Sequence, residues 1–411
     1  MNLTRYKYRL NYIGKHKNED DTQVMKLTVD RNKLWQGIDT VLDAVPSKPA
    51  LPVLANILLE ADGETLSLAA TDLDLSIRTE IPAAIEKKGR ITVPARTLAE
   101  ITREWPDAEL SIEVQDDRLK LSGRLGEADS SEGAYSLSGM AADEFPNMPT
   151  SLEGVGLTLG DDEADSSVLV DMINKTAFAV SRDDTRPVLN GVLWRIDSQG
   201  MQMVATDGSR LACYKLAIDL KDQVEGDEES SVIVPPQALS QIVKLLGGQG
   251  GPVKITLGET QVLFEMGHKK LLSRLIEGPY VDYGQVIPQN NKKELRIASE
   301  DLLPAVRRVS ILSSSYTRQV RFKLNSGQVE LSAASPEIGG EAREVIPAQY
   351  TEDEMEIGYN AQYLIEIIRK MDTNEIRFEL ENHVTAALLR PTEQKEGEDY
   401  FCLLMPLRPT G

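Results

Sequence analysis

Residues 52–81 read PVLANILLEADGETLSLAATDLDLSIRTEI, and residues 187–216 read PVLNGVLWRIDSQGMQMVATDGSRLACYKL. A constant offset of 135 aligns the two PVL triplets, Leu58 with Leu193, and the ATD at 70–72 with the ATD at 205–207. A weaker third copy, VRFKLNSGQVELSAASPEIGGEAREV, occupies residues 320–345, with Ala333 in the place of Ala205. Self-similarity at a fixed spacing predicts a repeated structural unit.

A second block repeats as well. It reads ITVPARTLAEITREW at 91–105, VIVPPQALSQIVKLL at 232–246 and IGYNAQYLIEIIRKM at 357–371. In each copy a short apolar strand leads to Pro or Asn and then to apolar residues three or four apart, which predicts a helix. The prolines suit the first turn of a helix, where a missing N–H costs little.

The two blocks together predict three copies of one α+β unit of about 130 residues. Alternation such as TLSLA at 65–69 and MQMVA at 201–205 is typical of antiparallel sheets with one buried face. Hairpin signals lie at Asp62-Gly63, Ser198-Gln199-Gly200 and Asn325-Ser326-Gly327. Six helices are expected, at 30–44, 94–105, 165–182, 235–248, 300–314 and 360–371.

Turn-rich and charged stretches near 149–154 and 288–293 divide the units. The predicted domains are 25–153, 154–290 and 291–411. Residues 1–24 differ from the rest, being polar and tyrosine-rich with five Lys and Arg against three Asp and Glu. We interpret them as a disordered tail or as a segment upstream of the functional start at Met25. A tail with its own binding role is the alternative.

Composition bounds the class of protein. The 411 residues are 41% hydrophobic and 27% charged, which is ordinary for a globular chain. Only Cys213 and Cys402 are present, too few for a disulfide framework or a Cys-rich zinc site, so a reducing, cytoplasmic setting is expected. The sequence contains no apolar run of 18 residues and no signal-peptide core at its N-terminus.

The net charge of −20 argues at first against a nucleic-acid partner, because phosphate binding needs clustered Lys and Arg. The distribution of charged residues along the chain weakens this objection. The six expected helices contain 86 residues with a net charge of +1, so the other 325 residues carry −21. The acidity therefore lies on strands and loops, and the helices are the surface least repulsive to phosphate.

An enzyme is one alternative, because Thr71-Asp72, Thr206-Asp207 and Ser209-Arg210 place hydroxyls beside charged groups. However, none of the three histidines stands in a repeated or motif-like setting that would supply a general base. The Thr-Asp pairs recur at the same repeat position, which indicates a structural turn. We therefore expect no catalysis, no metal and no cofactor. A protein-binding scaffold is the second alternative.

Several motifs resemble one known family. VATDGSRLA at 204–212, EFPNMP at 144–149, MEIGYNAQYL at 355–364 and LLMPLR at 403–408 resemble the bacterial replicative sliding clamps, the beta subunit family of DNA polymerase III. The resemblance covers residues 25–408. It implies a head-to-tail homodimer whose six domains form a ring around duplex DNA, with helices lining the hole. It also implies a clamp loader, the polymerase III catalytic subunit, and other replication and repair proteins as partners, with no membrane.

In this family, partners insert a short peptide into an apolar pocket between the second and third domains. The motif matches imply these pocket residues: Leu189, Thr206, Gly208, Ser209, Arg210, Leu211, Val281, Gln285, Val286, Ala386, Leu403, Met405, Pro406, Leu407 and Arg408. Leu, Val and Met suit an apolar anchor, and Arg210 and Arg408 suit peptide carbonyls or carboxylates. The alternative is that Leu189, Leu211 and Val286 are simply core. Val281, Gln285 and Ala386 stand where the family commonly has Pro, Arg and Ser.

Basic residues on helices and adjoining loops are the candidates for DNA contact. They are Lys48, Arg103, Arg182, Arg186, Lys244, Arg307, Arg308, Arg369 and Lys370. Lys48 lies where the family has a basic loop residue that touches DNA. The alternative for each is a solvated helix face or an intrahelical pair. The resemblance also implies a dimer contact between Tyr135 and Leu137 of the first domain and Ile311 and Leu312 of the third. Intradomain core is the alternative for these four.

Overall fold

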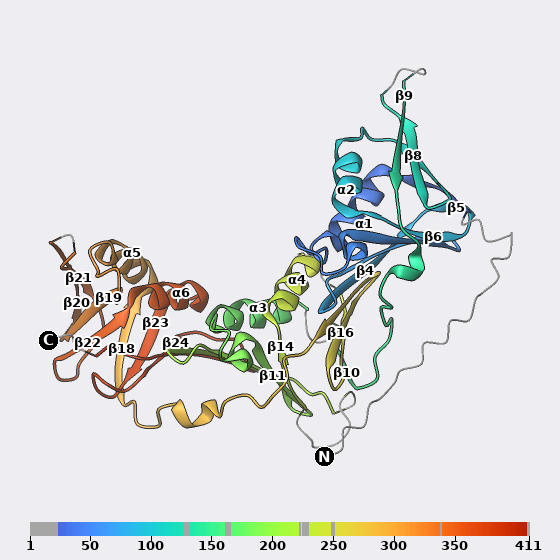
Figure 1. The fold of residues 1–411 in the computed structure, drawn as a ribbon. Helices are drawn as coiled ribbons and strands as arrows, with labels where there is room; N and C mark the ends of the chain where they lie inside the picture. The colour runs from blue at the N-terminus through green and yellow to red at the C-terminus, as the bar shows by residue number, and fades with distance from the viewer. Residues whose placement is uncertain are drawn as a thin grey trace, which may run out of the picture. The chain divides into compact units, whose positions relative to one another are not determined.

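The computed structural model describes residues 24–126, 131–160, 166–221, 223, 230–247, 251–337 and 339–408. The interpretation of residues 1–24 therefore lies outside the described residues, apart from Val24. The described chain divides into two compact units. One comprises residues 24–72 and 78–147, and the other comprises residues 73–77 and 148–408. Figure 1 labels the elements of both units.

The first unit contains two helices and two sets of antiparallel strands (Figure 1). One set runs in the order β5-β1-β7-β8-β9 and the other β4-β3-β2-β6. The strands are β1 Val24–Asp30, β2 Asn56–Asp62, β3 Thr65–Thr71, β4 Leu75–Pro82, β5 Ala84–Lys87, β6 Gly89–Pro94, β7 Glu109–Gln115, β8 Arg118–Arg124 and β9 Glu132–Ser138. The helices are α1 Arg31–Leu42 and α2 Ala95–Glu104, with 3₁₀ turns η1 Pro52–Ala55 and η2 Ala142–Glu144.

The second unit holds the other two repeats. Its first half contains β10 Val155–Leu159, α3 Ser167–Thr176, η3 Ala177–Ala179, η4 Pro187–Asn190, β11 Val192–Asp197, β12 Gly200–Thr206, β13 Arg210–Ala217, β14 Ser230–Val234, α4 Pro236–Leu246, β15 Val253–Leu257, β16 Gln261–Met266 and β17 Lys269–Arg274. Its second half contains η5 Tyr283–Val286, β18 Lys293–Ala298, α5 Ser299–Ser310, β19 Gln319–Asn325, β20 Gln328–Ser335, β21 Gly340–Pro347, β22 Met355–Asn360, α6 Ala361–Met371, β23 Glu375–Leu380, β24 Ala387–Pro391 and β25 Glu398–Leu404.

The register of strand pairs confirms the repeat. Leu58 lies opposite Ala69 in the β2–β3 pair, and Leu193 lies opposite Val204 in the β11–β12 pair, which is the same pairing shifted by 135. The third copy forms β19, β20 and β21. The predicted hairpin turns are present, with Gly63 at φ +62° and Gly327 at φ +77°, a region that glycine enters at little cost.

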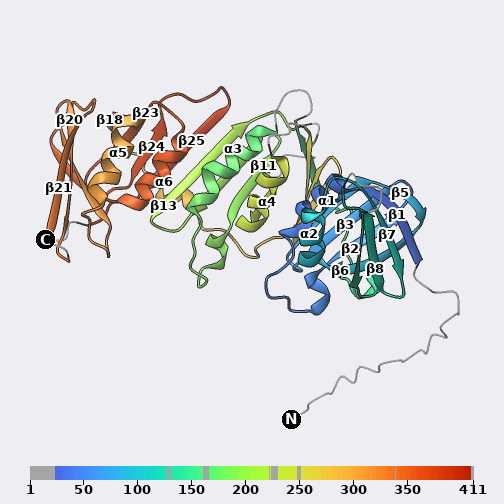
Figure 2. The ribbon, with the colours of Figure 1, turned by 90° about the horizontal axis from the view of Figure 1, so that it is seen from above.

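One continuous sheet joins the second and third repeats. Its order is β14-β11-β12-β13-β25-β24-β23-β18, so β13 of one repeat pairs with β25 of the next. Figures 1 and 2 show α3 and α6 side by side over one face of this sheet, and α3 contacts β13 while α6 contacts β25. The junction between repeats is therefore built from backbone hydrogen bonds as well as from side-chain packing.

The helices begin where the sequence predicts. The side chain of Asn360 accepts hydrogen bonds from the N–H groups of Gln362 and Tyr363, capping α6. Pro235 precedes α4 and Pro236 is its first residue. Two predicted helix ends are wrong. The helix expected to reach Arg182 ends at Thr176, and the helix expected to reach Ser314 ends at Ser310. Arg182 therefore lies in a loop.

Candidate functional site

The junction of β13 and β25 brings together segments far apart in the sequence. Leu211 lies opposite Leu403, so the chain leaves β25 beside the turn that precedes β13. The N–H of Met405 donates to the carbonyl of Ser209 over 2.9 Å, and the N–H of Leu407 donates to Gly358 over 2.8 Å. These two bonds fix residues 405–407 against both repeats.

A buried apolar cluster forms the floor at this junction. It contains Leu193, Val204, Leu211, Cys213, Ile233, Tyr283, Ala386, Leu388, Phe401 and Leu403. Burial raises the pKa of the Cys213 thiol to about 11, so this cysteine packs as an apolar group and is a poor nucleophile. Three predicted pocket residues, Leu211, Ala386 and Leu403, are thus buried together. Leu189 is also buried, as the core interpretation expects for it and for Leu211.

Around this floor, the side chains of three apolar residues are exposed. The exposed fractions are 43% for Val281, 54% for Val286 and 42% for Met405. The core interpretation of Val286 is therefore wrong. The connector that carries Val281 and Val286 packs onto the cluster through Tyr283, with Tyr280 and Ile287 partly buried against it. A buried apolar cluster with exposed apolar side chains beside it is a surface that suits an apolar anchor of a partner.

The turn before β13 is held by its own side chains. The Thr206 hydroxyl donates to the carbonyl of Arg210 over 2.6 Å, and Asp207 Oδ1 accepts from the N–H of Ser209 over 2.8 Å. Gly208 has φ +92°, and a Cβ at that position would lie 3.1 Å from Arg186 Nη1. Glycine therefore allows both this backbone conformation and the close approach of Arg186.

The guanidinium of Arg210 has an internal role. Its Nε donates to Asp207 Oδ2 over 3.1 Å and its Nη2 donates to the carbonyl of Phe178 over 2.8 Å. Its Nη1 donates to Glu366 of α6, and its Cζ lies 4.5 Å from the ring centroid of Tyr363. The side chain is 8% exposed. The expectation that this guanidinium is free to hold a peptide carboxylate is corrected, because its donors are used within the protein.

Two other polar candidates, Gln285 and Arg408, differ in their contacts within the protein. Gln285 Nε2 donates to Asp282 Oδ2 over 2.8 Å, and Arg408 is exposed at the end of the described chain. Two residues that the motif matches did not include also belong to this site. Tyr283 is part of the buried cluster, and Tyr280 is partly buried against it. Two tyrosines within the connector segment PYVDY were a usable signal, because aromatic residues concentrate at recognition sites.

The predicted dimer residues lie at a sheet edge and a helix end. β9 is the edge strand of its sheet, and Tyr135 on it is 44% exposed. The ring of Tyr135 meets Trp105 edge-on, with centroids 5.1 Å apart. A pocket of about 290 Å³ is lined by Glu100, Ile101, Glu104, Trp105, Leu125 and Tyr135. In the second unit, Ile311 is 74% exposed and Leu312 half-buried, just after α5.

Eight of the nine DNA candidates are exposed and Lys370 is half-buried. Arg103 pairs with Glu104, Arg186 with Asp183, and Arg308 with Glu344. The Arg308 hydrogen bond lowers the pKa of the Glu344 carboxyl, so this pair is ionised at neutral pH. Within the described residues, a further group makes no ion pair. It contains Lys48, Arg182, Arg307, Arg369 and Lys370.

The described residues contain no cluster of His, Cys, Asp or Glu that could hold a metal ion. In the part of the chain that the structure describes, no helix is long and apolar enough to cross a membrane.

Known proteins that are similar to this chain belong to one family. The domain models of the DNA polymerase III beta subunit match in order, the N-terminal domain at residues 25–149, the central domain at 163–282 and the C-terminal domain at 284–408. The beta sliding clamp of Synechococcus elongatus is 33% identical over 374 residues, covering 89% of this chain and 96% of its own. That of Bacillus subtilis is 31% identical over 395 residues, covering 93% and 100%.

Solved structures agree. The sliding clamp of Pseudomonas aeruginosa bound to griselimycin superposes with a TM-score of 0.84 at 30% identity, covering 94% of this chain and 100% of that one. The C. crescentus beta sliding clamp, crystallised with polyethylene glycol, gives 0.83 at 32% identity, with the same coverage. The chain therefore belongs to the DNA polymerase III beta subunit family and is a bacterial sliding clamp.

Proposed function

We propose that this clamp surrounds duplex DNA as a head-to-tail dimeric ring and recruits its partners through short peptides that bind the cleft beside β13 and β25. The partners are the polymerase catalytic subunit, the clamp loader, and other replication and repair proteins with such peptides. The observation that carries the proposal is the exposure of three apolar side chains, Val281, Val286 and Met405, beside a buried apolar cluster. Surface side chains of this kind gather where a partner covers them.

The chemistry of the cleft selects an apolar peptide anchor. Leu211 and Leu403 belong to the buried apolar cluster. Packing a Leu or Phe side chain of a partner against this cluster is favourable, because it removes apolar surface from water. Met405 has a flexible, polarisable side chain, which suits a surface that several partners share. The polar handles are few, because Gln285 pairs with Asp282 and Arg210 is committed to Glu366. Arg408 is the remaining guanidinium for a peptide carboxylate.

Sliding clamps are processivity factors, and we propose that this chain likewise acts without catalysis and without a cofactor. Its Thr-Asp pairs support that proposal, since Thr206 donates to a backbone carbonyl and Asp207 accepts from Ser209 and pairs with Arg210. These groups build a turn. We place the three domains at 25–153, 154–290 and 291–411, and we place the protein in the cytoplasm, where the replication machinery works.

The dimer is proposed to form between the edge of one protomer's first domain and the third domain of its partner. The aromatic pocket beside β9 supports this, because Trp105, Leu125 and Tyr135 form an apolar hollow at an unpaired strand edge. Ile311 is an exposed apolar side chain that could pack into the apolar hollow of the partner protomer. Leu312 packs beside Gly340 at the start of β21, the edge strand of the third domain.

Substitution of Met405 tests the cleft. Met405→Glu places a charge on the apolar rim, and we expect at least a tenfold loss of affinity for a fluorescent peptide carrying the polymerase's clamp-binding segment. Deleting residues 405–411 is expected to abolish binding while the dimer survives. Val24→Glu, on a strand of the first unit, is the matched control and should bind as the unaltered protein does. Unchanged peptide affinity in Met405→Glu and in the deletion would overturn the assignment.

A further inference from the structure

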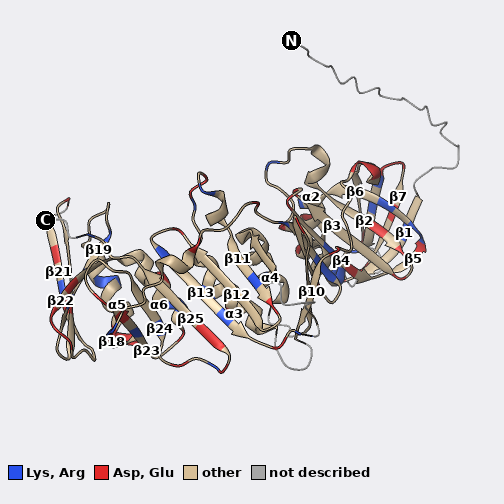
Figure 3. Ribbon diagram, turned by 90° about the horizontal axis from the view of Figure 1, so that it is seen from below, with Lys and Arg blue, Asp and Glu red and all other residues tan. Residues whose placement is uncertain are grey.

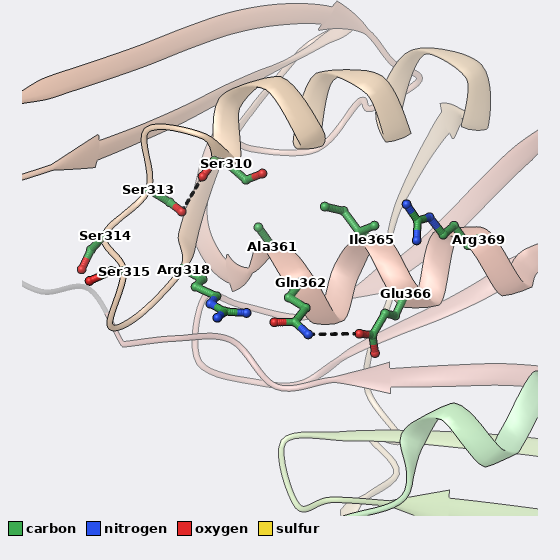
Figure 4. Close-up of a pocket in the computed structure, with 10 residues that line it drawn as sticks. All are labelled: Ser310, Ser313, Ser314, Ser315, Arg318, Ala361, Gln362, Ile365, Glu366 and Arg369. Atoms are coloured by element: carbon green, nitrogen blue, oxygen red, sulfur yellow. Dashed lines mark hydrogen bonds between the residues drawn. The ribbon is translucent and has the colours of Figure 1, made fainter. Parts of the chain in front are cut away.

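A cationic pocket of about 560 Å³ opens at the start of β1 in the first unit. It is distinct from the pocket in Figure 4, which lies beside α6 and contains Arg369, a residue already expected to contact DNA. Its lining contains four Lys and Arg against two Asp and Glu, a net charge of +2 in a chain of net charge −20. The charged lining residues are Lys26, Lys87, Glu113, Asp116, Arg118 and Lys120.

The strand register places these side chains on one face of a sheet. Lys26 of β1 lies opposite Lys87 of β5 on one side and opposite Glu113 of β7 on the other. Glu113 in turn lies opposite Lys120 of β8, and Arg118 is two residues from Lys120 and so on the same face. The alternate residues of these strands are buried, namely Met25, Val114 and Leu119. The cations therefore lie on the solvent face.

Only one of these four cations has a counter-ion within the described chain. Lys26 Nζ lies 2.8 Å from Glu86 Oε2 and 3.9 Å from Glu113 Oε1. The other three, Lys87, Arg118 and Lys120, are exposed and form no ion pair with any residue that the structure describes. Like charges on neighbouring strands of one face repel one another. The pocket therefore favours an anionic occupant.

The chain carries a matching anion directly before it enters this pocket. Val24 lines the pocket, and residues 19–21, which read EDD, are separated from it by only two residues. An extended chain advances about 3.3–3.6 Å per residue, so Asp21 can lie about 10 Å from Val24. Val24 lies opposite Gln115, which lies opposite Arg118. Two strand spacings make this distance about 10 Å as well, so the segment is long enough to reach the far side of the pocket.

The tether selects this segment over an acidic peptide from another protein. Each contact would be an exposed ion pair, which contributes little to affinity by itself. A segment attached two residues away meets the pocket at an effective concentration on the order of 1 mM, so weak pairs suffice to hold it. Three carboxylates then face three cations that have no other counter-ion. A separate peptide of the same charge lacks this advantage.

We propose that residues 19–21 dock on this pocket of the same chain, with Lys87, Arg118 and Lys120 as the contacting groups. The contact would anchor residues 1–17, which contain five Lys and Arg and no Asp or Glu, beside the first unit. It would also occupy three cations to which other polyanions could adhere. The proposal depends neither on the ring nor on the peptide cleft.

The test follows a fluorophore attached to the full-length protein at Asn18→Cys. Cys213 and Cys402 are buried, so the new thiol is the one that reacts. The pocket variant adds Lys87→Gln, Arg118→Gln and Lys120→Gln. The control variant removes the same charge from exposed positions of the first unit outside the pocket, by Lys33→Gln, Lys48→Gln and Arg96→Gln.

We expect the fluorescence anisotropy of the pocket variant to be lower by roughly a third, because a released terminus moves within nanoseconds. The control variant should match the unaltered labelled protein. Sodium chloride at about 0.5 M should lower the anisotropy of the unaltered protein to that of the pocket variant, because salt screens exposed ion pairs. Equal anisotropy in the pocket variant and the unaltered protein would overturn the proposal.

Charge exchange identifies the contact. The segment variant Glu19→Lys/Asp20→Lys/Asp21→Lys should lower the anisotropy as the pocket variant does. Adding Lys87→Glu/Arg118→Glu/Lys120→Glu to it should restore the original value, and failure to restore it would place the segment on another surface. Mixing the labelled pocket variant with excess unlabelled unaltered protein should leave its anisotropy low. Recovery there would make the occupant the segment of a second copy and would overturn docking within one chain.

Discussion

At the scale of single residues, Arg210 connects the peptide cleft to the helix layer. Its backbone begins β13 at the cleft, while its guanidinium reaches Asp207, Phe178 and Glu366. The Asp207 side chain is 14% exposed and that of Glu366 is 33% exposed. Removing the guanidinium would leave one nearly buried carboxylate and one partly buried carboxylate without their main partner.

We predict that Arg210→Ala lowers the free energy of unfolding by roughly 2–4 kcal/mol, because an unpaired buried carboxylate keeps its desolvation cost. Arg210→Lys should recover only part of this, since a lysine cannot make the three directed bonds. Urea unfolding followed by circular dichroism measures the change. Arg296→Ala, which breaks an exposed pair with Glu294, is the control and should cost less than about 0.5 kcal/mol. A similarly small effect in Arg210→Ala would show that the network is dispensable.

The sequence could not reveal this network. Arg210 was predicted as a pocket residue from its place in the ATDGSRL motif. Its partner Glu366 lies 156 residues further along the chain, on a helix of the next repeat. Their meeting depends on the pairing of β13 with β25, which no local pattern specifies. Leu211 lies in the same strand pair, opposite Leu403.

At the scale of elements, the repeat and the periodic patterns predicted helices and hairpins well. The caps at Pro235, Pro236 and Asn360 and the turns at Gly63 and Gly327 lie where local chemistry requires them. The helix ends were predicted less well. After Thr176 the chain tightens into the 3₁₀ turn η3, although the apolar pattern AFAV continues at 177–180. Burial of Ala179 continues the pattern after the helix has ended.

We predict that Ile311→Asp converts the protein from a dimer to a monomer. Ile311 is 74% exposed in the described chain, so the charge costs the monomer little, but it would be buried unpaired in the proposed interface. Sedimentation equilibrium should then give about 45.4 kDa where the unaltered protein gives twice that mass. Val384→Asp, another exposed apolar residue, is the control and should remain dimeric. A dimeric Ile311→Asp protein would place the interface elsewhere.

At the scale of the whole molecule, the acidic composition and the DNA-binding function are compatible. Among the described residues, helices α1 to α6 contain ten Lys and Arg against seven Asp and Glu, a net charge of +3. Figure 3 shows acidic residues on strands and loops of both units. The total of −20 is therefore carried outside the helices. An acidic exterior discourages DNA from adhering there. A protein that holds DNA by surrounding it needs no high affinity.

The central claim is that the clamp is linked to DNA by topology. Its most direct measurement loads the full-length protein onto nicked circular DNA with its clamp loader and ATP, removes free protein, and follows the bound fraction before and after one cut that linearises the circle. The clamp is expected to stay on the circle and to be lost within minutes of linearisation, by sliding off the ends. Equal loss from the circular and linear forms would contradict it.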